Sequence, residues 1–234
     1  MKFKITFVVL FLLLPVISMT QTIEPDYSKL FSRVTPPANL NPTPLGTSSI
    51  ITTSADGYDN IYLGTDFGEP HVAINPTDPL NAATAYNINT GYYVTLNGLD
   101  WTKIGVSFPS SSAIGDPVLS YDSLGNLYYL QMYQIGSLYG AWVTKSTNKG
   151  VSFLTPVSAY SFNNGLGDKP WMTCDQTAGP YSNNIYVGWR QFGASGMRFV
   201  RSTNGGQSYT SPLSFAGDQG AYVSVGANGN ISGG

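Results

Sequence analysis

The sequence of 234 residues is poor in charged side chains, cysteine and histidine. Charged residues make up 10% of it, against roughly 25% in an average soluble protein, and the formal net charge is only -2. So little charge excludes a coiled coil or a helix bundle, and the absence of a basic excess excludes nucleic-acid binding through bulk charge. A single cysteine excludes an internal disulfide framework and a cysteine-based zinc site.

Turn-forming and aromatic residues are abundant instead. The chain holds 26 Gly, 15 Pro and 16 Tyr, and aromatic residues account for 13% of it. This aromatic content excludes a disordered chain. Many turn formers between stretches of strand-favouring residues predict an all-β protein with short strands.

The first twenty residues have the pattern of a secretory signal peptide. Lys2 and Lys4 precede an apolar run from Ile5 to Ile17, and the polar chain begins after Thr20. The run of 13 residues is short for a membrane span of about 20, although an uncleaved anchor is the alternative. We therefore expect residues 1–20 to be removed, and the protein to be secreted or held at the cell surface without a membrane span.

A proline-rich leader covers residues 21–48. Its five prolines prevent a regular helix or a central strand, so we expect a linker or a surface strap. Residues 49–234 are predicted to form one β domain. Within it, the segment 49–64 is a candidate outer strand for the last repeat of the domain.

The domain repeats a pattern at its strand starts. Similar segments begin at intervals of 47, 52 and 50 residues, and they are Gly68-Glu69-Pro70, Gly115-Asp116-Pro117, Gly167-Asp168-Lys169-Pro170 and Gly217-Asp218-Gln219-Gly220. An apolar alternating stretch, a turn and further short strands follow each start. Four strands in about 50 residues predict β-propeller blades. Their expected bounds are about 68–108, 115–160, 167–215 and, for an incomplete fourth, 217–234.

A second repeated pattern follows the third strand of each unit. Ser146–Phe153 matches Ser202–Tyr209 position by position at an offset of 56 residues, and Thr95–Trp101 is a degenerate copy. The physical interpretation is a tight hairpin in which Asn adopts a positive φ, Gly a second unusual conformation, and the final aromatic packs on the neighbouring layer. The positions that define the pattern are Ser146, Asn148, Gly150, Phe153, Ser202, Asn204, Gly206 and Tyr209.

This second pattern resembles the Asp-box, or BNR repeat, of the sialidase superfamily. Both full copies carry Asn where the family usually has Asp, which still allows the turn. The resemblance covers about 68–230 and implies a sialidase-like Asp-box β-propeller, present here as three blades and the start of a fourth. Because members usually close with about six blades, we expect an N-terminal part of a longer protein. The alternative is a homodimer that completes the ring.

The catalytic set of a true sialidase is not visible in this part. The resemblance implies three arginines that hold the substrate carboxylate, the first on the first inner strand, but Glu69-Pro70-His71 occupies that place. Arg190 is the best single candidate for contact with an anion, because a guanidinium recognises a carboxylate through two parallel hydrogen bonds. One arginine does not make a triad, so sialidase activity is not expected from these blades.

A recurrent acidic residue provides a candidate binding ring. If the repeats are equivalent, its members lie around the axis, and they are Glu69, Asp116, Asp168 and Asp218. They could bind sugar hydroxyls, a cation such as Ca²⁺, or act as an acid and base pair on a glycoside. A residue that repeats in every blade favours a structural role, so the asymmetric His71, Trp171 and Arg190 are the better functional candidates.

Three functions remain open at this point. The first is an exported propeller that binds glycans or surface proteins. The second is an exo-acting glycoside hydrolase of sialidase-like type whose site is completed by further C-terminal blades. The third is a structural or assembly scaffold. No cofactor is predicted, and Ca²⁺ at the acidic residues is left open.

Overall fold

The computed structural model describes residues 50–53, 55, 57–63, 68–87, 91–109, 113–163, 165–227, 229 and 231–233. All of them belong to one compact unit, Pro42–Gly234, whereas a second unit, Met1–Asn41, lies outside the described residues. The predicted signal peptide and leader, 1–48, therefore also lie outside them. Every regular element of the described part is a β-strand, which confirms the all-β prediction. A search of that part for a helix able to cross a membrane finds none.

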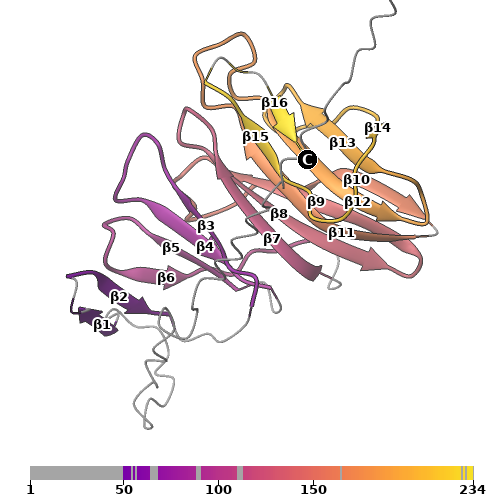
Figure 1. Cartoon of the computed structure of the whole chain (residues 1–234). Coiled ribbons are helices and arrows are strands. Elements are labelled where there is room, and N and C mark those ends of the chain that lie inside the picture. Colours follow the sequence, from indigo (N-terminus) through magenta and orange to yellow (C-terminus); the bar gives the residue numbers. More distant parts are fainter. Residues whose placement is uncertain are drawn as a thin grey trace, which may run out of the picture. The chain divides into compact units, whose positions relative to one another are not determined.

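Three four-stranded antiparallel sheets follow one another along the chain (Figure 1). The first sheet contains β3 (His71–Ile74), β4 (Ala82–Ala85), β5 (Tyr92–Thr95) and β6 (Trp101–Lys103). The second contains β7 (Ala113–Tyr121), β8 (Leu127–Ile135), β9 (Leu138–Ser146) and β10 (Val157–Asn163). The third contains β11 (Leu166–Cys174), β12 (Ile185–Phe192), β13 (Met197–Ser202) and β14 (Leu213–Phe215). In each sheet, strands adjacent in sequence are also hydrogen-bonded neighbours.

Two hairpins flank these sheets in the sequence. One pairs β1 (Ile50–Thr53) with β2 (Asp59–Tyr62), and the other pairs β15 (Val223–Val225) with β16 (Ile231–Gly233). The predicted outer strand within 49–64 is β2, and its described partner is β1, with Ile61 opposite Ile51. No described pairing joins β2 to β15 or β16.

The first strands of successive sheets are neighbours. β3 contacts β7, β7 contacts β11, and β11 contacts β15. The remaining strands of each sheet follow outward from its first strand in sequence order. The three four-stranded sheets therefore pack face to face, with their first strands next to one another. One hydrophobic interface lies between the first and second sheets, and another lies between the second and third.

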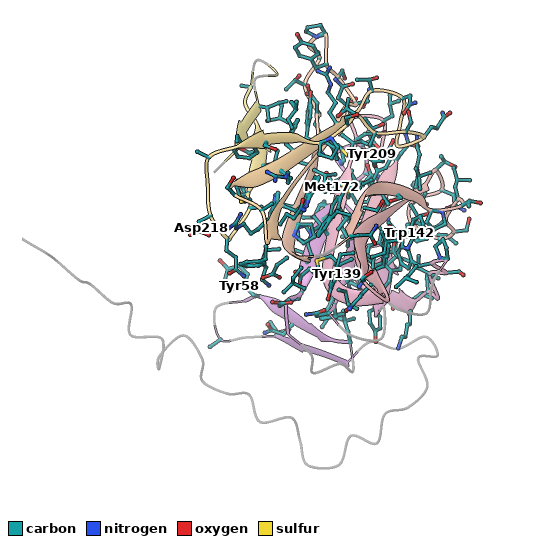
Figure 2. The ribbon with its side chains drawn as sticks, turned by 90° about the vertical axis from the view of Figure 1, so that its right-hand side faces the viewer. Tyr58, Tyr139, Trp142, Met172, Tyr209 and Asp218 are labelled. Atoms are coloured by element: carbon teal, nitrogen blue, oxygen red, sulfur yellow. The ribbon has the colours of Figure 1, made fainter. Side chains whose placement is uncertain are left out.

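Strand β8 shows why both interfaces form. Its side chains alternate between the two faces of the second sheet. Leu127 and Tyr129 pack toward the first sheet, and Tyr128 and Leu130 pack toward the third. All four are essentially buried, because a neighbouring sheet covers each face of β8. Consecutive residues of this stretch can therefore be apolar, without alternation with polar ones. Figure 2 shows Met172 of the third sheet within this packed interior.

Antiparallel pairing gives every sheet two distinct ends. We call the end where the first strand begins the start end, and the opposite end the turn end. The turn between first and second strands lies at the turn end, and so does the turn between third and fourth strands. The matched segments Ser146–Phe153 and Ser202–Tyr209 therefore lie at the turn end.

These two matched turns have the same internal hydrogen bonds. The Asn148 side-chain oxygen accepts bonds from Ser146 Oγ and from the Ser152 backbone N–H, both at 2.9 Å. Asn204 accepts the equivalent bonds at 2.9 and 3.0 Å. Gly150 has the expected unusual conformation, with a φ of 86°, but the other positive φ (62°) lies at Lys149 and not at Asn148, because Asn148 acts through its side chain rather than through an unusual backbone.

The final aromatic of each matched turn packs at an interface between sheets. Phe153 meets Tyr92 of the first sheet edge-on, with 5.1 Å between ring centroids. Tyr209 packs against the interface between the second and third sheets. Each turn is thus attached to the preceding sheet through its ring.

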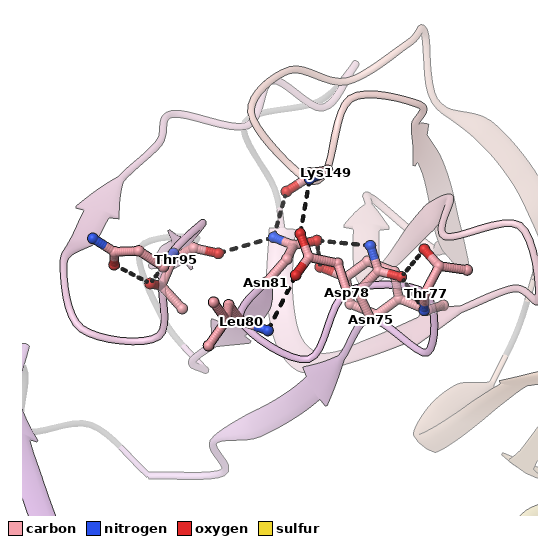
Figure 3. A network of polar contacts seen from close by, with 9 residues as sticks. Asn75, Thr77, Asp78, Leu80, Asn81, Thr95 and Lys149 are labelled. Carbon is pink, nitrogen blue, oxygen red and sulfur yellow. Dashed lines mark hydrogen bonds and ion pairs between the residues drawn. The ribbon is translucent and has the colours of Figure 1, made fainter.

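Asn81 is the centre of a buried polar network at the turn end (Figure 3). Its amide nitrogen donates to the backbone oxygens of Thr95 at 2.9 Å and Lys149 at 3.0 Å. Its amide oxygen accepts from Asn75 Nδ2 at 3.0 Å and from Tyr121 OH at 3.2 Å. Because Lys149 and Tyr121 belong to the second sheet, one buried side chain connects the first two sheets. We call this set the turn network.

Candidate functional site

At the start end, three residues share an unusual backbone conformation. Glu69, Asp116 and Lys169 have φ values of 55°, 51° and 45°, and each directly precedes a proline. A positive φ at a residue other than glycine is uncommon and costs on the order of 1–3 kcal/mol. In β7 and β11 this conformation lies at a β-bulge, where the ladder of hydrogen bonds between strands is already interrupted. The proline that follows has no N–H, but at a bulge its absence removes no further ladder bond.

The shared conformation identifies which residues are equivalent. Lys169, not Asp168, occupies in the third sheet the position of Glu69 and Asp116. Asp168 lies one residue earlier, in register with Arg190 of β12. The four acids aligned in the sequence are therefore not one symmetric ring, because Asp168 lies one residue before the position that Glu69 and Asp116 occupy.

Lys169 connects the three four-stranded sheets at the start end. Its ammonium forms an ion pair with Glu69 and lies 3.8 Å from Asp116 Oδ1. Its backbone N–H donates to Asp116 Oδ2 at 3.0 Å. Asn87, at the end of β4, donates from its side chain to Glu69 and accepts from the Asp116 N–H at 3.2 Å.

These contacts shift the pKa values of the Glu69 and Asp116 carboxyl groups in opposite directions. The Lys169 ammonium holds the pKa of Glu69 below its usual value, with help from hydrogen bonds to Asp116 and Asn87. Burial, followed by the neighbouring Glu69 carboxyl, raises the pKa of Asp116 to about 6. Burial opposes the charge on Lys169, but Glu69, Asp116 and Asp168 outweigh it and raise its pKa. Neighbouring carboxyls with divergent pKa values could act as an acid and a base.

Arg190 is largely occupied by the protein itself. Its Nη1 donates to the backbone oxygens of Gln191 at 3.3 Å, Ala194 at 3.0 Å and Gly196. Its Nε lies 3.6 Å from Asp218 Oδ1, and that Asp218 side chain is 92% exposed. Figure 2 shows Asp218 at the margin of the domain. The main role of Arg190 is to hold the turn between β12 and β13.

A further polar contact links the third sheet to the segment before β15. The Gln219 side chain donates to Asp168 Oδ2, and the Gln219 backbone N–H donates to Asp218 at 2.9 Å. We call the polar residues at this end the strand-start cluster. Its members are Glu69, Asn87, Asp116, Asp168, Lys169, Arg190, Asp218 and Gln219.

Three aromatic residues follow members of this cluster in the sequence, two of them on first strands and the third, Tyr222, just before β15. Trp171 meets His71 with 5.2 Å between ring centroids and Tyr222 with 4.9 Å. Tyr222 is 55% exposed, and Trp171 and His71 are half-buried. His71 Nδ1 accepts the Leu119 N–H at 3.2 Å, and burial lowers the pKa of His71, so its ring is neutral at pH 7. We call His71, Trp171 and Tyr222 the aromatic trio.

The structure brings the sequence-predicted site residues together in separate groups. Glu69 and Asp116 meet through Lys169, His71 meets Trp171, and Arg190 meets Asp218. Sequence reasoning missed four residues, which are Asn87, Lys169, Gln219 and Tyr222. Aligning the repeats on their prolines rather than on their glycines would have identified Lys169, because all three of these positive-φ residues precede a proline.

Metal binding gains no support from this geometry. Within the described ranges, no group of three or more His, Cys, Asp or Glu side chains could hold a metal ion. The two predicted acids closest to each other share the ammonium of Lys169.

Comparison with known proteins gives structural likeness only. No protein-family model matches the sequence, and no curated protein matches it. A protein of unknown function from Dyadobacter fermentans DSM 18053 is similar over 75% of this chain and 59% of its own, with 14% identity and a TM-score of 0.52.

Two enzymes are more distant in structure. The Hadza microbial sialidase Hz136 is similar over 63% of this chain and 33% of its own, with 13% identity and a TM-score of 0.44. The polysaccharide lyase Uly1 is similar over 58% and 40%, with 12% identity and a TM-score of 0.39. This chain thus spans less than two thirds of each of the three. Among them, the Dyadobacter protein alone is close enough to indicate a shared fold.

Proposed function

We propose that this chain forms blades of an exported, sialidase-like β-propeller that binds glycans at its start end. Three successive four-stranded sheets whose first strands are neighbours support the propeller. Two matched turns with identical hydrogen bonds support the Asp-box resemblance. The lysine-flanked apolar run before Thr20 supports export.

The observation that carries glycan binding is the aromatic trio beside the strand-start cluster. Ligand sites combine apolar or aromatic surface with a few convergent polar groups. Tyr222, which is 55% exposed, and the half-buried Trp171 against it supply aromatic surface, and Glu69 and Lys169 supply polar groups that are each 42% exposed. A sugar ring fits this combination, because its C–H face stacks on an aromatic ring while its hydroxyls bond to charged groups.

Binding can be tested with purified protein on a glycan array, followed by calorimetry of the best ligands. We expect Trp171→Ala to weaken binding by about 30-fold, as expected for an aromatic anchor of a binding site. Tyr222→Ala should weaken it less, and Tyr181→Ala, at a comparably exposed tyrosine in the β11–β12 turn, should leave it unchanged. Absence of binding to every glycan would overturn this function and favour a scaffold or a protein partner.

Glycoside hydrolysis is a second candidate, favoured by the divergent pKa values of Glu69 and Asp116. Its test is turnover of a panel of fluorogenic glycosides by the protein and by Asp116→Asn. Turnover that Asp116→Asn abolishes would establish it. Turnover at background for all substrates would remove it for that panel and leave glycan binding in place.

A further inference from the structure

The cations of the strand-start cluster are already bonded to oxygen atoms of the protein. The Lys169 ammonium lies between the carboxylates of Glu69 and Asp116. Arg190 directs Nη1 to three backbone carbonyls, while its buried Nε makes no hydrogen bond and lies 3.6 Å from Asp218 Oδ1. An anion that approached the Lys169 ammonium would compete with carboxylates that the protein itself supplies.

The acceptors of the cluster are more available than its donors. The cluster contains four carboxyl groups and two cationic side chains, so it carries an excess of negative charge. Asp218 is 92% exposed, and its recorded contacts are the Gln219 N–H and the Arg190 Nε. Glu69 is 42% exposed beside the rings that would stack on a sugar. Hydroxyl and ammonium groups of a ligand would therefore find charged acceptors.

We infer that the site accepts sugars that present hydroxyl or ammonium donors, and rejects sugars that carry carboxylate or sulfate groups. The inference rests on the proposed glycan binding at this end and specifies its ligand class. An acidic sugar would place its charge among carboxylates with no unoccupied lysine to neutralise it, and desolvating a charge without a partner is costly. A neutral sugar meets no such obstacle, and an amino sugar adds charge attraction.

The test uses matched tetrasaccharides on gluco, galacto and manno backbones, each in neutral, amino and uronic acid form. Calorimetry measures the affinity of the same protein for every member. We expect the best neutral or amino form to bind at least about tenfold more tightly than its uronic acid counterpart, which corresponds to about 1.4 kcal/mol. Equal or tighter binding of the uronic acid form overturns the inference and leaves glycan binding intact. No binding by any form overturns the proposed function itself.

Two matched variants identify the charge that is responsible. Asp218→Asn removes an exposed carboxylate and is expected to lower the affinity for the amino form by about threefold to fivefold, with little change for the neutral form. Asp78→Asn makes the same change at the turn end, where Asp78 pairs with Lys149, and should leave both affinities unchanged. An equal effect of the two variants would contradict the assigned location.

Discussion

Neighbouring sheets are connected at both of their ends, but the kind of contact differs between the turn end and the start end. At the turn end, amide and hydroxyl groups of buried or half-buried residues satisfy one another, and the pattern repeats from sheet to sheet. At the start end, charged side chains connect the sheets, and the positive-φ positions before proline carry Glu69, Asp116 and Lys169. The backbone conformation is the same at these three positions, whereas the side chains differ. We infer that the conformation is required by the fold and that the side chains have another role.

The difference also concerns how much each end contributes to stability. A buried side chain with four hydrogen bonds, such as Asn81, cannot be removed without leaving partners unsatisfied. Ion pairs that are partly exposed contribute little. The turn end is therefore expected to hold the sheets together, and the start end to be free to vary with the ligand.

The largest expected effect is at Gly150 of the turn end. A Cβ there would lie 2.2 Å from Tyr92 Oη, whose hydroxyl donates to Gly150 O at 3.0 Å, and φ is +86°. We expect Gly150→Ala to lower the free energy of unfolding by about 4 kcal/mol, through overpacking, strain and a lost hydrogen bond. Urea unfolding followed by fluorescence measures it.

Gly206 provides the matched control for that substitution. It has a similar φ of +82°, but its nearest neighbour to a Cβ would be Tyr128 Cε1 at 3.4 Å. Gly206→Ala should therefore cost only the backbone strain, about 1–2 kcal/mol. Equal losses at the two glycines would show that the contact with Tyr92 is unimportant.

Asn81→Ala compares the two ends directly. We expect it to lower the free energy of unfolding by about 3 kcal/mol, because it orphans buried polar groups in both of the first two sheets. Asn87→Ala, which removes an amide from the strand-start cluster, should cost less than about 1 kcal/mol. If urea unfolding showed a larger loss of stability for Asn87→Ala than for Asn81→Ala, the claim that the turn end contributes more to stability than the start end would be contradicted.

The raised pKa of Asp116 predicts a pH dependence of stability that originates at the start end. Because the folded protein binds this proton more tightly than the unfolded chain, stability falls as the pH rises from the ordinary aspartate range through about 6. Glu69, whose pKa is lowered, contributes in the opposite sense at lower pH. Unfolding free energies between pH 5 and pH 7 should therefore fall less in Asp116→Asn than in the wild type.

The smallest expected effect is that of Lys169→Met. Although Lys169 contacts both carboxyls, its side chain is 42% exposed, so we expect the free energy of unfolding to change by less than about 1 kcal/mol. The same variant should restore the pKa of Glu69 toward its usual value, which carboxyl NMR titration would detect. A large loss of stability would mean that the strand-start cluster is structural.

The sequence was most informative where residues repeat. The repeated strand starts and the matched turns predicted an all-β chain of repeated strand units with a tight third hairpin, because local pattern determines these features. The start end was less predictable. The third repeat has one residue more between its glycine and its proline, so Lys169 and not Asp168 takes the position of Asp116, and no local pattern indicates that Lys169 reaches Glu69, one hundred residues earlier. Tyr222 lacked any signal, since its ring contact depends on packing between sheets.

The most direct test of the account is to map a bound glycan on the protein by NMR. We predict that titration of the tightest glycan shifts backbone amides of the start end, at Lys169, Trp171, His71 and Tyr222, and leaves those of Asn81 and Asn148 in place. Shifts concentrated at the turn end would contradict the account. So would shifts in the separate groove of 540 Å³ lined by Ile104–Pro109 and Val151–Pro156.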